Sequence, residues 1–212
     1  NVCQGFLVKI EVASHADAYT LFESLNNRGM PLTAIDLIKN KLLARLETTE
    51  PGKVDHYFDV WNKLLGYLGD DYSVQERFFR HYYNAFKDPL NVPFRKDDDK
   101  KKDPLGPVAT RSNLIQIYER LINQDAKHHL QAIRSAGQLY ALMLARNTDE
   151  AWAPLDKPLK DLDRIQGAPS YLLMLYLLVR REALGIDVAQ LEEIARLLVC
   201  FFVRRNLTDT PP

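Results

Sequence analysis

The chain has 212 residues, of which 46% are hydrophobic, and its 28 Lys and Arg residues balance its 28 Asp and Glu residues. This length and apolar content predict a soluble globular protein, with one domain and a partial appendage rather than two full domains. Zero net charge disfavours a stand-alone nucleic-acid-binding protein, so any DNA contact would come from a local patch or from other domains.

Residues 7–12 alternate between apolar and charged side chains, and this period of two predicts a half-buried β-strand. A lone strand is not stable in water, and no later segment has a convincing strand pattern. We therefore expect its partner strands to precede residue 1 and interpret the N-terminus as truncated.

Residues 17–46 predict two helices joined by a sharp turn. The first carries apolar residues at helical spacing and stops where Gly29 would supply a left-handed C-terminal cap. Pro31 cannot continue that helix. Thr33 and Asp36 then form a capping-box pattern, which predicts a second helix over residues 32–46.

The same stretch carries a family signature. Residues 21–43 read LFESLNNRGMPLTAIDLIKNKLL, which resembles the second signature of the GmrSD-type, modification-dependent restriction endonucleases. The matching positions are Phe22, Leu25, Asn26, Arg28, Gly29, Leu32, Asp36, Leu37, Ile38 and Asn40. The DGQQR motif, which precedes this signature in the family, does not occur in the chain.

The resemblance implies an internal piece of a larger enzyme. Residues 1–48 would be the C-terminal remnant of a ParB-like, nucleotide-hydrolysing domain, and residues 49–212 a helical domain. In the full protein the ParB-like domain would hydrolyse a nucleoside triphosphate. A C-terminal HNH domain would cleave modified DNA with a divalent metal.

Several polar residues of the signature are candidates for a nucleotide or domain interface: Asn26, Arg28, Gly29, Asp36, Lys39 and Asn40. Turn chemistry alone can explain Gly29 and Asp36. The other four are not needed for the turn and could hold a phosphate or an adjacent domain. Arg28 is the strongest candidate, because a guanidinium can donate two hydrogen bonds to one phosphate or carboxylate.

Downstream, helical spacing of apolar residues predicts a helix over 54–68, and Ser73 with Glu76 forms a capping-box pattern for the next helix. That helix is dense in aromatic residues: Phe78, Phe79, Tyr82, Tyr83 and Phe86. Rings can stack on nucleic-acid bases, but these lie at core spacing and predict a buried cluster.

Residues 88–107 contain four prolines and a run of mixed charges, and they predict a mobile, solvated loop. Helices are then expected over 113–122, 125–146 and 156–165. Two more follow, over 171–181 after Pro169 and from Asp187 after Gly185, and we expect these to be the most buried. The predicted fold is mainly α, an irregular helical bundle with a short N-terminal strand.

The C-terminal residues FFVRRNLTDTPP resemble the stretch that precedes the HNH region in the same family. Arg204 and Arg205 are therefore weak candidates for nucleic-acid binding. Their alternative role is to complement the dipole at a helix C-terminus.

Catalytic and metal sites are not indicated. His128 and His129 with Asn147 suggest an HNH motif, but their surroundings are helical, and neighbouring residues on a helix point about 100° apart. Cys3 and Cys200 are expected to be reduced thiols. The longest apolar run, 171–179, is well short of the roughly 20 residues that span a membrane, and no export signal is visible, so a cytoplasmic location is expected.

The leading expectation is the internal helical region of a nucleotide-dependent endonuclease that restricts modified foreign DNA, such as phage DNA. This region would couple nucleotide hydrolysis to cleavage without a catalytic site or cofactor of its own. The alternative is a non-enzymatic helical domain that binds proteins or acts as a DNA-binding regulator. The sequence leaves the oligomeric state open.

Overall fold

The computed structural model describes residues 32–90, 108–146, 149–165 and 167–208, and these ranges are mainly helical. The helices are α2 (Ala34–Thr49), α3 (Val54–Leu68), α4 (Tyr72–Leu90), α5 (Leu114–Met143), α6 (Ala153–Arg164), α7 (Tyr171–Leu184) and α8 (Val188–Leu207). Short 3-10 turns occur at Glu150–Trp152 and Ala168–Ser170. The predicted mainly α fold is confirmed, whereas the strand and helix expected over 7–25 lie outside the described residues.

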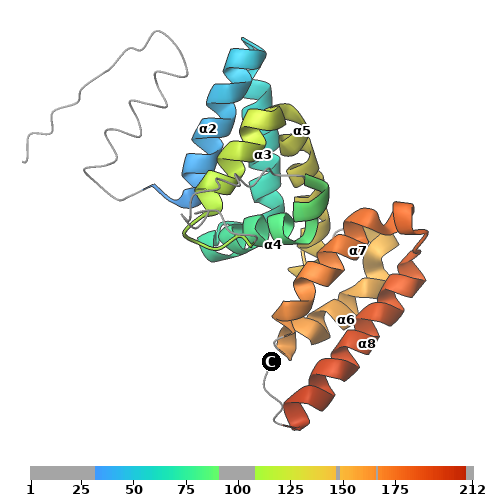
Figure 1. The fold of residues 1–212 in the computed structure, drawn as a ribbon. Coiled ribbons are helices and arrows are strands. Elements are labelled where there is room, and N and C mark those ends of the chain that lie inside the picture. Colours follow the sequence, from blue (N-terminus) through green and yellow to red (C-terminus); the bar gives the residue numbers. More distant parts are fainter. Residues whose placement is uncertain (1–31, 91–107, 147–148, 166, 209–212) are drawn as a thin grey trace, which may run out of the picture.

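The helices form two groups that meet at the end of α5 (Figure 1). Helices α2, α3 and α5 lie alongside one another, and α4 crosses one end of this group. Helices α6, α7 and α8 form the second group, in which α8 packs mainly on α6 and lies on the outer side. Helix α5 contacts helices of both groups. The division of the chain at residue 48 stays a prediction, and α2 packs against α3 and α5.

Helix α2 begins as the sequence predicts. The Thr33 side chain accepts a hydrogen bond from the backbone N–H of Asp36 at 3.2 Å, and the Asp36 carboxylate accepts one from the N–H of Thr33 at 3.3 Å. This reciprocal pair satisfies two N–H groups that the helix itself cannot. Ile38, Leu42 and Leu43 then bury one side of α2 in the core.

Helix α3 matches its predicted bounds. The five aromatic residues of α4 that the core interpretation names are buried: Phe78, Phe79, Tyr82, Tyr83 and Phe86. The predicted cap of α4 is wrong. The Asp71 carboxylate accepts hydrogen bonds from the N–H and the hydroxyl of Ser73, so the helix begins earlier, at Tyr72. Glu76 instead pairs with Arg80 at 3.2 Å and with Arg111 at 2.9 Å. Aspartate is an equally good cap and comes first in the chain.

Helix α5 joins two helices that the sequence predicts separately. Asp125 has non-helical backbone angles, φ −158° and ψ 90°, within the continuous element. Its carboxylate accepts a hydrogen bond from the backbone N–H of His128 at 2.9 Å. Asp125 therefore caps the second segment internally, and the predicted break appears as a kink in one long element.

The predicted loop over 88–107 begins later than expected. Helix α4 continues to Leu90, so residues 88–90 are helical rather than part of a loop. The remainder, 91–107, lies outside the described residues. Helix α6 also differs from its prediction, because it begins at Ala153, with Pro154 in its first turn where no helical N–H bond is lost.

Helices α7 and α8 are not the most buried elements, and that prediction is wrong. Gly185, with φ 66°, ends α7 and Asp187 caps α8, as expected. The structure adds Gln190, which completes a capping box with Asp187. However, Phe201 is 58% exposed, and only Leu191, Ala195 and Phe202 of α8 are buried. The reason is that α8 packs chiefly on α6, so its apolar run has a partner on one side only.

This difference in burial predicts contrasting mutational effects. Leu175 on α7 is fully buried, so Leu175→Ala should lower the free energy of unfolding by about 2 to 5 kcal/mol. Phe201→Ala, at an exposed site, should change it by less than about 1 kcal/mol. Urea denaturation followed by circular dichroism measures both. Equal losses in the two variants would contradict this packing.

Candidate functional site

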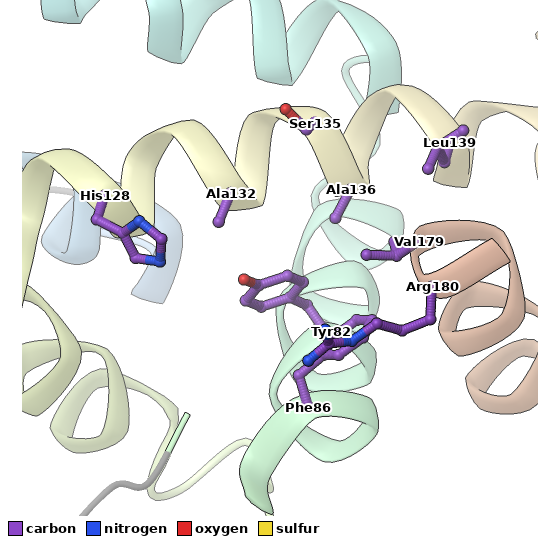
Figure 2. A pocket seen from close by; sticks show the side chains of 9 residues that line it. All are labelled: Tyr82, Phe86, His128, Ala132, Ser135, Ala136, Leu139, Val179 and Arg180. Atoms are coloured by element: carbon purple, nitrogen blue, oxygen red, sulfur yellow. The ribbon is translucent and has the colours of Figure 1, made fainter. Parts of the chain in front are cut away.

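A hollow of about 390 Å³ lies between α4, α5 and α7 (Figure 2). Tyr82 and Phe86 form one wall, and the Arg180 side chain extends toward them from α7. Burial raises the pKa of Tyr82 to about 12, so its phenol stays protonated at neutral pH. His128 and Ser135 also line the hollow, but they lie about two turns apart on α5 and do not form a nucleophile–base pair.

A second hollow, about 340 Å³, is lined by cationic side chains and lies where the two helix groups meet. We call it the basic cleft. Its lining comes from the ends of α3 and α5, from the first turns of α4, and from α6. The charged residues in it are Arg77, Arg146, Lys160, Arg164 and Asp163. Four cations against one carboxylate make this a local positive patch on a chain of zero net charge.

Arg146 is positioned by an unusual turn after α5. Ala145 adopts a left-handed backbone conformation with φ 54°, and the N–H of Arg146 donates to the carbonyl of Ala141 at 3.0 Å. The Arg146 guanidinium then lies against Gly69, where an added Cβ would overlap it. Gly69 itself has φ 80°. The positive φ favours glycine at this position, whereas the Arg146 guanidinium, at the end of a flexible side chain, could shift away from a Cβ.

Two residues that line the cleft, Arg77 and Asp163, both contact Tyr171. The Arg77 guanidinium carbon lies 5.8 Å from the centre of the Tyr171 ring, a cation–π arrangement. The Tyr171 hydroxyl donates to the Asp163 carboxylate at 2.9 Å, and burial together with this bond raises the pKa of Tyr171. Among the described residues, the buried Nε of Arg77 has no hydrogen-bond partner.

His81 lies next to Tyr171 and does not add positive charge to the cleft at neutral pH. Its Nδ1 is 3.1 Å from the Tyr140 hydroxyl, and its ring packs edge-on against Tyr171. Burial, and then the nearby Arg77 and Arg80, lowers the pKa of His81 from 6.5 to about 4. The positive charge of the region at neutral pH therefore comes from arginine and lysine.

The signature residues within the described part cluster at the start of α2. Asp36 caps the helix and lies 3.6 Å from the Lys39 ammonium. Asn40 is only 4% exposed, and its Nδ2 has no hydrogen-bond partner in the described part of the chain. Asn26, Arg28 and Gly29 lie outside the described residues. The interface role of this set stays a prediction.

Arg204 and Arg205 lie in the last turn of α8, as expected from the helix dipole. The Arg205 guanidinium carbon lies 5.7 Å from the Phe202 ring centre, and Arg204 is exposed. Helices α2 and α8 lie in different helix groups (Figure 1), so these arginines and the described signature residues do not form one site.

The residues of the basic cleft were not found from the sequence, because they lie far apart in the chain and share no motif. One partial signal exists: Arg77 and Arg80 alternate with the aromatic residues of α4, which is typical of nucleic-acid-binding surfaces. In the structure the aromatic rings between Phe78 and Phe86 are buried, whereas Arg77 lines the cleft.

His128 and His129 lie on one helix, in the helical setting that argues against an HNH motif. In the described residues no group of three or more His, Cys, Asp and Glu side chains could hold a metal ion. Over the same ranges no helix is long and apolar enough to cross a membrane.

No protein-family model matches the chain, and neither a curated protein nor a solved structure matches it.

The depressed pKa of His81 predicts acid sensitivity. Between about pH 6.5 and 4 the unfolded chain binds a proton at His81 that the folded chain does not, so stability falls as the pH falls through this window. His81→Gln should flatten the dependence of unfolding free energy on pH there, and His56→Gln, at an exposed position, should leave it unchanged. Urea titrations at several pH values measure the slopes. Identical slopes for all three proteins would refute this role of His81.

Proposed function

We propose that these helices belong to a nucleotide-dependent endonuclease that restricts modified foreign DNA. In this proposal they are a non-catalytic region that couples nucleotide hydrolysis in a ParB-like domain to cleavage by an HNH domain with a divalent metal. The observation that carries the proposal is the basic cleft, whose cations come from both helix groups.

The chemistry of the cleft suits a DNA backbone. Arginine and lysine side chains neutralise phosphates, and such contacts orient a protein on the duplex without reading its sequence. A coupling region needs this kind of contact, because recognition of the modified base and cleavage would occur in other domains. Since α4, α5 and α6 each contribute cations, DNA bound there would also respond to any movement between the two helix groups.

The described half of the signature gives independent support. The stretch from Leu32 to Asn40 forms the capped start of α2, as the pattern of turn and helix residues predicts. Lys39 is only partly buried, so it is accessible to a neighbouring domain or a bound nucleotide. Arg28 stays the preferred candidate for nucleotide sensing.

The alternative, a non-enzymatic protein-interaction domain, is favoured by a different observation, the exposed apolar side of α8. A DNA-binding regulator would share the basic cleft with the proposed function. In the protein that carries the upstream domain, DNA binding by such a regulator would not depend on nucleotide hydrolysis.

The cleft predicts salt-dependent DNA binding. Lys160→Glu combined with Arg164→Glu should weaken binding of a short labelled duplex at least tenfold at low salt. It should also reduce the slope of log affinity against log salt by about 2, since each phosphate contact contributes about 0.9. Both residues lie on α6 and line the cleft. Fluorescence anisotropy at several salt concentrations gives the affinity and the slope.

The matched control is Arg45→Glu combined with Lys63→Glu, which changes the net charge equally at exposed positions outside the cleft. The control should bind like the parent chain apart from the small effect of net charge. A parent chain that does not bind DNA, or equal losses in both double variants, would overturn the assignment of the cleft.

The proposal also predicts that the chain alone neither hydrolyses nucleoside triphosphates nor cleaves DNA, because the motifs for both reactions lie in other domains. The assay incubates purified chain with modified phage DNA, each nucleotide and Mg²⁺ or Mn²⁺. Metal-dependent nicking that follows the chain through successive purification steps would contradict a non-catalytic role.

A further inference from the structure

The outer side of α8 exposes several apolar residues in a row. Leu197 is 63% exposed and Leu207 is 80% exposed, and Cys200 between them is also exposed. The opposite side of the helix is buried against its own group, chiefly α6. Figure 1 shows α8 at the outer edge of the molecule, away from α2 and α3. Exposed apolar residues on the outer side of a helix are typical of an interaction surface.

The spacing of the exposed positions is that of a helix-pairing seam. Steps of three and four residues alternate along one stripe, the pattern by which two helices pack along their length. The stripe consists of Gln190, Glu193, Leu197, Cys200, Arg204 and Leu207, all exposed. Its apolar centre is flanked by an acidic residue toward the N-terminus of α8 and a basic residue toward the C-terminus.

We propose that α8 pairs with α8 of a second copy of this chain, antiparallel, about a two-fold axis midway between Leu197 and Cys200. In this register Leu197 packs against Cys200 of the second copy, and Glu193 lies opposite Arg204 of the second copy. The same two contacts repeat on the other side of the axis, as two-fold symmetry requires.

Charge selects both the partner and the direction. A parallel pair would bring Glu193 against Glu193 and Arg204 against Arg204, and like charges facing each other are unfavourable. The antiparallel pair converts both repulsions into attractions. The charges of the stripe are thus complementary to those of a second stripe in the antiparallel direction. A two-fold dimer requires this arrangement, whereas binding of an unrelated apolar partner does not.

Charge exchange tests the register. Glu193→Arg and Arg204→Glu should each raise the dimer dissociation constant at least tenfold in sedimentation equilibrium, because each places like charges opposite one another. The double variant should return it to within threefold of the parent value. Glu182→Arg, on an exposed side chain of α7, should leave it unchanged. Both stripe residues are exposed, so folding should be preserved in every variant.

Thiol cross-linking tests the direction. With Cys3 replaced by serine, the two Cys200 residues of an antiparallel pair are offset by about 5 Å along the helix axis, and a short bis-maleimide should join them. In a Cys3→Ser, Cys200→Ser chain with Gln190→Cys, the two thiols would be about 25 Å apart along the axis and should not cross-link.

A chain that stays monomeric at every concentration would overturn the proposal, and so would a dimer that is indifferent to the charge reversals. Cross-linking at position 190 would show a parallel pair and would also overturn it. If the stripe instead binds a different protein, the parent chain alone should be monomeric.

Discussion

The contact of Tyr140 with His81 and Tyr171 holds the two helix groups together. The Tyr140 hydroxyl lies 3.1 Å from Nδ1 of His81 on α4, and its ring centre lies 6.3 Å from that of Tyr171 on α7. On the other side, Tyr140 packs against Phe78 at 5.1 Å within the α4–α5 core. Tyr140 and Phe78 are fully buried and His81 is partly buried, so water is excluded from around the Tyr140 ring.

The basic cleft depends on that junction. Arg77 lies over Tyr171, and Asp163 accepts a hydrogen bond from the same ring's hydroxyl, so the junction orients one cation of the cleft and engages its single carboxylate. Arg146 follows the turn after α5, and its guanidinium lies beside Gly69. A chain with zero net charge can thus present a local excess of positive charge, because packing gathers cations from helices that are distant in sequence. Neutral composition argues against a global field but not against a local site.

The sequence predicts features that depend on a few neighbouring residues. The capping box at Thr33, the helix end at Gly185 and the cap at Asp187 are such features, since each is decided within one helical turn. Features decided by tertiary contacts were not predicted. The apolar run around Phe201 resembles a buried helix in sequence, but α8 packs on one side only. The cleft escapes sequence analysis for the same reason, because only the packing of α4, α5 and α6 brings its cations together.

The proposed binding of DNA phosphate in the basic cleft can be tested by an NMR titration of the isotope-labelled chain with a short DNA duplex, following backbone amides and arginine Nε–H signals. Signals of Arg77, Arg146 and Arg164 should shift together, with amides of α6 and of the end of α5. Shifts confined to other surfaces, with these signals unchanged at saturating DNA, would contradict it.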